Sequence, residues 1–256
     1  MTTDTAREQY SRTRLLLGQQ GIDCLRAARV AVFGVGGVGG YVVEALARSG
    51  VGALDLIDDD KVCLSNLNRQ IIATHSTLGQ YKVDAAAARI RDIDPDIQVR
   101  TYKVFYTPET ADQFDFSQYS YVVDAIDTVS GKLALVMQAR AAGVPVICSM
   151  GAGNKLDPTR FEVADLYETS VCPLARVMRA ECRKRGIDHL KVVYSKEPPM
   201  APRPEEAMPA GMPDSSPARP GTPKKRAPGS NAFVPSAAGL IIAGQVVCDL
   251  TGCRND

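Results

Sequence analysis

The sequence predicts an α/β fold built on a doubly wound, mostly parallel β-sheet. Short apolar runs of strand length alternate along the chain with longer segments of helical periodicity, which is the rhythm of βαβ units. A glycine cluster joins the first such run, residues 30–33, to the first helical segment, residues 38–49. Asp58 and Asp127 follow two of the apolar runs. Ligands of such sheets bind outside the carboxyl ends of the strands, so these features together predict a Rossmann-like nucleotide crevice.

The glycine cluster has the spacing of a dinucleotide-binding fingerprint, Gly34-x-Gly36-x-x-Gly39. Glycines at a strand-to-helix junction allow a tight turn and bring backbone N–H groups against phosphate oxygens at a helix N-terminus. Asp58 ends the next apolar run, residues 53–57, where its carboxylate is expected to bind a ribose hydroxyl. The alternative is a glycine-rich turn without a ligand. The pattern does not specify which nucleotide binds.

The other elements follow in order. Helices are predicted in the lead-in 1–29 and over 83–91, 131–142, 173–185 and 237–250, the last capped by Ser236, with strands over 97–104, 119–125, 144–149 and, at an edge, 161–165. Residues 198–228 hold ten of the sixteen prolines, so a flexible loop is expected there. A single domain is expected, with a helical lead-in (1–29), a nucleotide-binding core (30–150), a C-terminal substrate-side part (151–197 and 229–256) and the proline-rich loop (198–228).

Composition excludes several classes of protein. Lys+Arg 30 against Asp+Glu 29 leaves a formal charge of +1, so any nucleic-acid site must be a local patch. No apolar run follows a basic N-terminus, and none is expected to be long enough to cross a bilayer, which indicates a cytoplasmic protein without a transmembrane segment. The seven cysteines form no Cys-x-x-Cys pair and there are only two histidines, so neither a four-thiolate zinc site nor a histidine-rich metal site is expected.

Five motifs together resemble the ubiquitin-activating-enzyme-like (HesA/MoeB/ThiF) superfamily, an adenylating fold. They run in the family's order across residues 11–130, and five motifs at the right separations are far more specific than any one. The motifs are Gly34-Val-Gly-Gly-Val-Gly39, Asp58-Asp-Asp60, Asn66-Leu-Asn-Arg-Gln70, Gly79-Gln-Tyr-Lys82 and Asp124-Ala-Ile-Asp127. The resemblance implies that the sheet carries that family's C-terminal extension, that ATP is the nucleotide, and that Mg2+ is the metal ion.

The resemblance also implies residue roles. Arg69 and Lys82 would neutralise charge as a carboxylate attacks the α-phosphate and pyrophosphate leaves. Asp127 would orient Mg2+, although by itself it is also a candidate helix cap before Ser130. Arg12, otherwise a surface charge, matches an arginine that crosses a dimer interface to the partner's ATP, so a homodimer with Arg12 as a catalytic residue is expected. The nucleotide-binding residues implied are Gly34, Gly36, Gly37, Gly39, Asp58, Asp60, Asn66, Arg69, Lys82 and Asp127.

Within the superfamily, the chain most resembles the tRNA threonylcarbamoyladenosine dehydratases. The closer match lies in Glu44-Ala-Leu-Ala-Arg48, Asn68-Arg-Gln-Ile71, Met150-Gly-Ala-Gly-Asn-Lys-Leu-Asp-Pro158 and Phe161-Glu-Val-Ala-Asp-Leu166. The reaction implied is the ATP-dependent cyclisation of the threonylcarbamoyl group on a tRNA adenosine through a carboxyl-adenylate, with release of AMP and pyrophosphate. The implied partners are tRNA, a second copy of the chain and, as an option, a sulfur-transfer accessory protein.

Two other functions remain open. One is an adenylating activator of a ubiquitin-like sulfur-carrier protein. The other is an NAD-dependent oxidoreductase or nucleotide-sensing module, which is weaker because Asn66, Arg69 and Lys82 suit a triphosphate and hydride transfer needs no such cluster. Cys172 and Cys182 lie near the segment where cysteine-using relatives place their nucleophile. We favour a structural role for both, because intramolecular ring closure does not require a thioester.

The expected tRNA contact is a basic helix that starts after Pro173. Its basic residues are Arg176, Arg179, Arg183, Lys184 and Arg185, at spacings that place several on one face. The alternative is an ordinary solvated helix face. Lys224-Lys-Arg226, in the proline-rich loop, is a second candidate.

Overall fold

The computed structural model describes residues 8–201 and 228–253 and has at its centre one seven-stranded sheet, which confirms the predicted α/β class. The strand order is β3-β2-β1-β4-β5-β7-β6, and all neighbouring strands are parallel except β6 and β7. The strands are β1 (Arg29–Phe33), β2 (Ala53–Ile57), β3 (Gln98–Tyr102), β4 (Tyr121–Asp124), β5 (Val146–Ser149), β6 (Phe161–Asp165) and β7 (Lys191–Ser195). The chain order reverses between β1 and β4, as in other doubly wound sheets.

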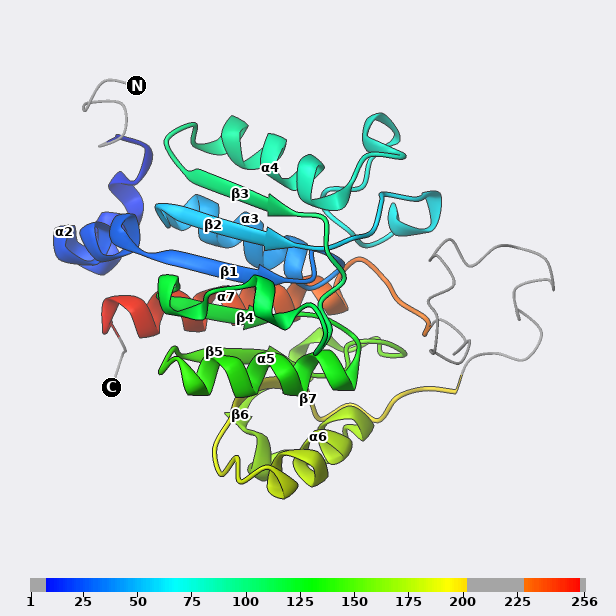
Figure 1. Cartoon of the computed structure of the whole chain (residues 1–256). Coiled ribbons are helices and arrows are strands. Elements are labelled where there is room, and N and C mark those ends of the chain that lie inside the picture. Colours follow the sequence, from blue (N-terminus) through cyan, green and yellow to red (C-terminus); the bar gives the residue numbers. More distant parts are fainter. Residues whose placement is uncertain (1–7, 202–227, 254–256) are drawn as a thin grey trace.

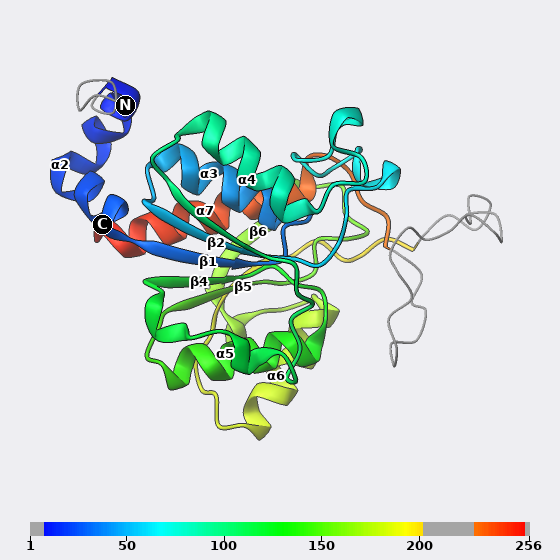
Figure 2. The same cartoon turned by 45° about the horizontal axis from the view of Figure 1, so that its top comes forward.

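Helices cover both faces of the sheet. Helices α3, α4 and α7 lie on one face, and α5 and α6 lie on the other (Figures 1 and 2). Helix α2 lies beyond the starts of the strands, at the end of the sheet away from the arrowheads. The helices are α2 (Ser11–Ala27), α3 (Gly39–Ser49), α4 (Lys82–Ile93), α5 (Val129–Ala141), α6 (Pro173–Lys184) and α7 (Val234–Thr251).

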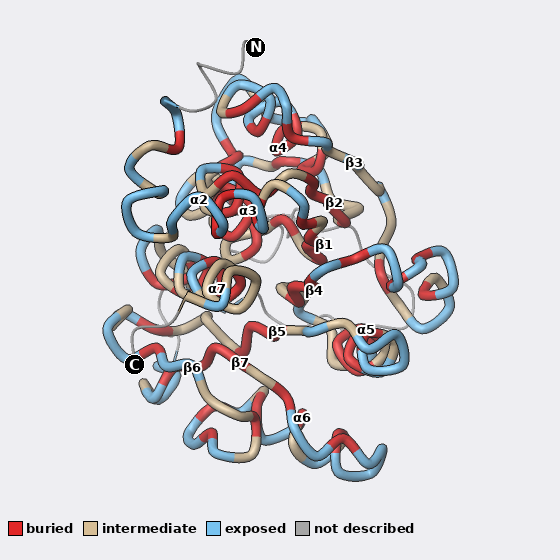
Figure 3. The backbone as a smooth tube through the Cα atoms, turned by 90° about the vertical axis from the view of Figure 1, so that its left-hand side faces the viewer, coloured by how far each residue is buried: buried red, intermediate tan, exposed pale blue. Residues whose placement is uncertain are grey.

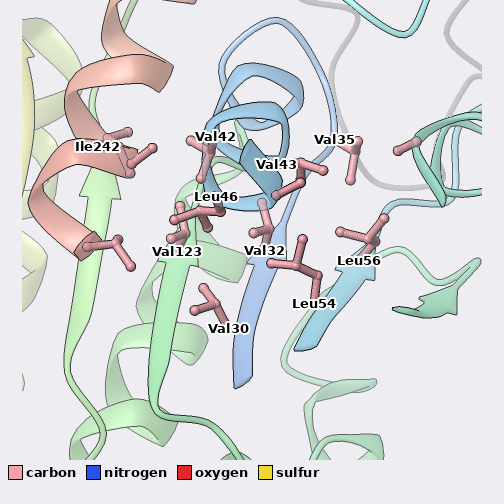
Figure 4. Packing of buried hydrophobic residues seen from close by; sticks show 14 of the residues in the cluster. Val30, Val32, Val35, Val42, Val43, Leu46, Leu54, Leu56, Val123 and Ile242 are labelled. Atoms are coloured by element: carbon pink, nitrogen blue, oxygen red, sulfur yellow. The ribbon is translucent and has the colours of Figure 1, made fainter. Parts of the chain in front are cut away.

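The main core lies between the sheet and the layer of α3 and α7. Val32, Leu54 and Val123 project from three adjacent strands toward Val42 of α3 and Ile242 of α7 (Figure 4). All five side chains are fully buried. Burying one such side chain is worth about 1.5–3 kcal/mol, so this layer holds α3 firmly against the strands. The glycine turn that precedes α3 is thereby fixed at the edge of the sheet.

Three strands end level at that edge. Phe33, the last residue of β1, pairs with Ile57 of β2 and Asp124 of β4. The chain segments that follow these three strands therefore leave the sheet side by side. They are the segments in which the sequence places its nucleotide-binding motifs.

Two details of the predicted elements are wrong. Strand β7 was not expected, although it joins β5 to β6 within the sheet. Ser236 does not cap α7, because the helix begins earlier, at Val234, and the Ser236 hydroxyl donates to Ala232 O, which precedes the helix. The start of the helix is instead held by Asn231, whose Oδ1 accepts hydrogen bonds from the N-cap Phe233 N at 3.2 Å and from Val234 N, the first helical amide, at 2.8 Å.

Helix α7 is also the described helix that best fits a membrane span by length and composition. It has 18 residues with a mean hydropathy of 1.5, so the expectation that no apolar run reaches this length was wrong. Its inner face packs into the core through Ala238, Ile242 and Val246, all buried. Core helices of other folds pass the same test, so α7 is weak evidence for a membrane.

Most of the proline-rich loop lies outside the described residues, and its predicted flexibility stays a prediction. Its two ends are described and are held together. Asn154 O accepts a hydrogen bond from Met200 N at 2.8 Å, and Asn154 N donates to Gly229 O at 2.7 Å. The chain therefore leaves and re-enters the fold beside Asn154.

Candidate nucleotide site

The turn between β1 and α3 requires two of its glycines. Gly34 has φ +86°, and a Cβ there would lie 2.7 Å from Ala125 O. A Cβ on Gly39 would lie only 1.8 Å from Gly34 O. Gly36 is different, because the nearest atom to its Cβ position is Gln70 Nε2 at 3.8 Å. Gly34 and Gly39 therefore shape the turn, whereas Gly36 leaves room beside it, at the N-terminus of α3, where an anion is favoured.

Asp58 ties the glycine turn to the loop after β2. Its Oδ2 accepts a hydrogen bond from Val35 N at 2.7 Å, and its Oδ1 accepts one from Asp60 N at 2.9 Å. Burial raises the pKa of the Asp58 carboxyl group, and the Lys82 ammonium group counteracts this rise. A carboxylate oxygen accepts more than one hydrogen bond, so Asp58 retains capacity for the predicted ribose contact.

Lys82 begins α4 and points back toward the same acidic segment. Its Nζ lies 2.8 Å from Asp60 Oδ2 and 3.8 Å from Asp58 Oδ1, and the side chain is 7% exposed. Lys82 N also donates to Asp60 O at 3.0 Å. Three residues predicted from two separate motifs are thus in one ion-pair cluster. A cation held in place at this point is suited to stabilise charge that develops on a phosphate.

Asn66 and Arg69 lie in the loop between β2 and α4, and hydrogen bonds within that loop hold both side chains. Asn66 is buried, and its Oδ1 accepts a hydrogen bond from Cys63 N at 3.2 Å. Arg69 donates through Nη1 to Ser65 O at 2.8 Å. The Cγ of Arg69 lies 3.6 Å from the Cβ position of Gly37, so its side chain runs beside the glycine turn. Arg69 as a whole is partly exposed, and its side chain therefore lies beside the turn at which a phosphate is expected.

The loop after β4 completes this edge. Ala125 N donates to Phe33 O at 2.8 Å, which holds the loop against the glycine turn. Asp127 is exposed, and none of its contacts with the other described residues is a hydrogen bond; the N-cap of α5 is Thr128. The helix-cap interpretation of Asp127 is therefore not supported. An exposed carboxylate beside the turn fits a hard cation such as Mg2+, which prefers oxygen ligands.

A buried ion pair beneath the same loop was missed. Lys132 Nζ lies 3.0 Å from both carboxylate oxygens of Asp124 and 2.8 Å from Ser149 O, and both side chains are 0% exposed. Asp124 Oδ1 also accepts a hydrogen bond from Ile126 N at 3.2 Å. The pair fixes the start of the loop that carries Asp127. The signal in the sequence was a lone lysine in an otherwise apolar helix segment, eight residues after an aspartate.

Arg12 is not near this cluster in its own chain. Tyr10, two residues earlier, donates a hydrogen bond to Asp94 Oδ2 at 2.6 Å and to Ala47 O at 3.2 Å. These acceptors lie at the carboxyl ends of α3 and α4, which is the opposite end of the sheet from the glycine turn (Figure 1). Arg12 itself is exposed. Any role of Arg12 at a nucleotide must therefore be exerted on another chain.

The basic residues of α6 do not form a single free face. Arg179 is half-buried and donates to Thr169 O at 2.9 Å. Lys184 and Arg185 both pair with Glu181, at 2.6 and 2.7 Å. Arg176 is exposed, as is Arg183, whose guanidinium group lies 5.2 Å from the centre of the Tyr167 ring. Four of the five predicted residues are therefore exposed, but Lys184 and Arg185 are paired with Glu181, which leaves Arg176 and Arg183 without an ion pair to a described residue.

Cys172, the N-cap of α6, and Cys182, within α6, are both buried, at 2% and 0% exposed. Burial raises the pKa of the Cys182 thiol, which disfavours the nucleophilic thiolate. Both pack with Met178 in the small core on this face of the sheet. This packing agrees with the structural role favoured from the sequence.

The chain belongs to the ThiF family, whose model matches residues 10–256. The superfamily resemblance predicted from the motifs is thus confirmed. Among the most similar relatives, the tRNA threonylcarbamoyladenosine dehydratase of Bacillus subtilis (strain 168) is 46% identical over 243 residues, which are 94% of each chain. The enzyme of the same name from Escherichia coli (strain K12) is 41% identical over 177 residues, 69% of this chain and 66% of the other.

The solved structures agree with this relationship. A crystal structure of the Escherichia coli tRNA N6-threonylcarbamoyladenosine dehydratase in complex with ATP superimposes with a TM-score of 0.84 at 31% sequence identity. A second crystal structure of that protein, in complex with AMP, has the same score and identity. Each alignment covers 98% of this chain and 97% of the other. The similarity therefore extends over the whole fold.

Proposed function

We propose that this protein is an ATP-dependent tRNA-modifying enzyme that cyclises the threonylcarbamoyl group on a tRNA adenosine. The observation that most strongly supports this function is the 46% identity to a threonylcarbamoyladenosine dehydratase over 94% of both chains. The cluster of Asp58, Asp60 and Lys82 beside the glycine turn supplies the chemistry that such an enzyme needs. The reaction is a net loss of water, with ATP converted to AMP and pyrophosphate.

ATP would lie across the carboxyl edge of β1, β2 and β4. The backbone N–H groups at the N-terminus of α3 would hold phosphate oxygens, and Asp58 would accept a ribose hydroxyl. Arg69 and Lys82 would offset negative charge as the substrate carboxylate attacks the α-phosphate and pyrophosphate leaves. Mg2+, oriented by Asp127, would further neutralise the phosphate oxygens.

The second step needs no nucleophile from the protein. Once the carboxylate is linked to AMP, a nucleophilic atom of the same modification attacks the acyl carbon, and AMP leaves with the electron pair of the broken bond. This intramolecular step is favoured by proximity alone. The burial of Cys172 and Cys182 is consistent with a route that forms no thioester.

We further propose that two copies of the chain form the active enzyme, with Arg12 of each reaching the nucleotide of the other. Leu15 and Leu16, on the same helix as Arg12, are 86% and 84% exposed, and Leu240 of α7 is 51% exposed. Figure 3 shows α2 as largely exposed along its length. Exposed apolar side chains of this kind mark protein interfaces, and a second copy would cover them.

The tRNA is proposed to contact the exposed arginines of α6, Arg176 and Arg183, with Lys224-Lys-Arg226 outside the described residues as a second basic segment. Clustered cations are needed because the net charge of +1 provides no general attraction to RNA. A cytoplasmic location agrees with a tRNA substrate. A sulfur-transfer accessory protein stays a prediction.

The test is a reaction of the purified protein with ATP and tRNA that carries the threonylcarbamoyl modification. We expect AMP release and, by mass spectrometry of the digested tRNA, a nucleoside lighter by one water. Unmodified tRNA is the control and should yield no AMP. AMP formed only with a ubiquitin-like carrier protein that ends in Gly-Gly would instead identify a sulfur-carrier activator.

A further inference from the structure

Asn154 holds both described ends of the proline-rich loop through three hydrogen bonds. Its backbone O accepts from Met200 N at 2.8 Å, and its backbone N donates to Gly229 O at 2.7 Å. Its side-chain Oδ1 accepts a third hydrogen bond, from Gly229 N, also at 2.7 Å. Asn154 has φ +58°, a left-handed conformation that asparagine adopts more readily than most residues. Two of the three bonds thus fix Gly229, and one of these two depends on the side chain of residue 154.

Gly229 belongs to residues 228–233, here called the return segment, which lead directly into α7 and are orange in Figure 1. The next residue of this segment, Ser230, contacts a different loop. Its backbone O accepts a hydrogen bond from Asn68 Nδ2 at 3.0 Å. The return segment therefore bridges the loop after β5, which carries Asn154, and the loop between β2 and α4, which carries Asn68.

The Asn68 amide also contacts Arg69. Arg69 Nη1 donates to Asn68 Oδ1 at 2.9 Å, in addition to its hydrogen bond to Ser65 O. Because the nitrogen of the Asn68 amide donates to Ser230 and its oxygen accepts from Arg69, the amide cannot turn over without losing both bonds. The position of Ser230 O therefore sets the orientation of the amide, and the amide in turn holds the Arg69 guanidinium group.

We propose that Asn154 is a positioning residue for Arg69 and that it acts through the return segment and Asn68. The proposal rests on the proposed function, in which Arg69 offsets charge as the substrate carboxylate attacks the α-phosphate. A cation stabilises that charge best when it is already in place, since no free energy is then spent on reorienting it in the transition state. The C-terminal part of the chain thereby fixes the geometry of a residue in the nucleotide-binding core.

Loss of the Asn154 side chain should loosen the return segment without releasing it. Asn231 is a second tie, since its Nδ2 donates to Lys155 O at 2.8 Å. Arg69 also keeps its hydrogen bond to Ser65 O. We therefore expect turnover to fall by about tenfold, which is less than the loss of about 100-fold expected when Arg69 itself is removed.

The test is a double-mutant cycle of Asn154→Gly and Arg69→Ala, read as the rate of AMP formation at saturating ATP and threonylcarbamoyl-modified tRNA. Glycine removes Oδ1 but tolerates a positive φ, so the two backbone hydrogen bonds of residue 154 are kept. Asn154→Gly should slow turnover about tenfold in the otherwise wild-type chain and less than about twofold in Arg69→Ala, because Arg69 is the group through which Asn154 acts. A residue with a purely structural role would slow both backgrounds equally.

Two further variants sharpen the comparison. Asn154→Asp keeps an acceptor for Gly229 N and should turn over within about threefold of wild type. Asp157→Ala is the matched control in the same loop. Asp157 Oδ1 accepts from Thr159 N at 2.9 Å, so this change removes the same kind of hydrogen bond without touching the return segment, and turnover should be unchanged.

The inference is overturned if Asn154→Gly turns over within twofold of wild type, or if it slows Arg69→Ala as much as it slows the wild-type chain. Equal slowing by Asp157→Ala would also overturn it, because any disturbance of the loop would then suffice. Loss of the folded state in Asn154→Gly, seen by circular dichroism, would make Asn154 a residue of the fold and refute the proposal as well. A wild-type chain that forms no AMP refutes the proposed function itself, which is distinguishable because it is seen before any variant is measured.

Discussion

The ammonium group of Lys82 lies 2.8 Å from Asp60 Oδ2 and 3.8 Å from Asp58 Oδ1. One lysine thus neutralises part of an acidic segment that also holds the glycine turn through Val35 N. A triphosphate that enters the site would compete with these carboxylates for the same cation. The ion-pair cluster keeps the lysine in position before the nucleotide arrives, which is the preorganisation that electrostatic catalysis requires.

Replacing Arg69 or Lys82 by alanine should each lower the rate of AMP formation by about 100-fold or more, the scale of one lost charged contact in the transition state. The two should differ in stability. Lys82→Ala leaves carboxylates without their buried partner and should lower the melting temperature, whereas Arg69→Ala should not. Lys61→Ala, an exposed lysine of the same loop, is the control. Near-normal turnover of both variants would show that the site is misplaced.

Mixing two inactive variants tests the role of Arg12 across an interface. Arg12→Ala and Asp127→Asn should each be inactive alone. A mixed dimer contains one site that is free of both changes, so mixing them should restore up to about a quarter of the wild-type activity if subunits exchange at random. Absence of recovery, with subunit exchange demonstrated by labelled chains, would mean that Arg12 does not act on the partner's nucleotide.

The buried pair of Lys132 and Asp124 should matter for stability. Lys132→Met leaves the Asp124 carboxylate buried and uncompensated, so the free energy of unfolding should fall by about 3–5 kcal/mol. The double change Lys132→Met with Asp124→Leu removes both charges and should recover much of that loss. Urea denaturation measures both. Equal losses in the single and double variants would show that the pair is not coupled.

Substitutions at two glycines of the turn should have different effects, one on folding and the other on ATP binding. Gly39→Ala places a Cβ 1.8 Å from Gly34 O, so the turn cannot form, and the protein should be destabilised by about 3 kcal/mol or more. Gly36→Ala meets no atom closer than 3.8 Å and should fold normally, yet its methyl group would occupy the space expected for a phosphate. Circular dichroism and ATP titration distinguish these effects. Normal ATP affinity in Gly36→Ala would place the phosphates elsewhere.

Charge reversal on α6 should weaken tRNA binding. Arg176→Glu with Arg183→Glu removes the two exposed arginines, so tRNA affinity should fall and the log–log salt slope should decrease by about 0.7–0.9 for each lost phosphate contact. ATP binding should be unaffected. Arg91→Glu is the control, because Arg91 is an exposed residue of α4, which lies on the other face of the sheet (Figure 2). An unchanged slope would assign the α6 arginines to ordinary surface.

The sequence by itself was sufficient to predict those parts of the fold that are determined by residues close together in the chain. The β1–α3–β2 unit was predicted because strand, glycine turn, helix and strand are all local patterns, and β2 was placed to the residue. The same local rules failed at α7. Ser236 looked like a cap, but the helix begins two residues earlier, where Asn231 accepts from Val234 N and Pro235 has no N–H to pair.

Only the tertiary structure decided which residues meet. Strand β7 is five residues long and is recognisable through its pairing with β5 and β6, which come from distant parts of the chain. The basic residues of α6 were equivalent in the sequence, but packing half-buries Arg179 against Thr169 and leaves Arg176 exposed. Pairing, burial and unsatisfied polar atoms are properties of three-dimensional contacts, which a spacing along the chain does not record.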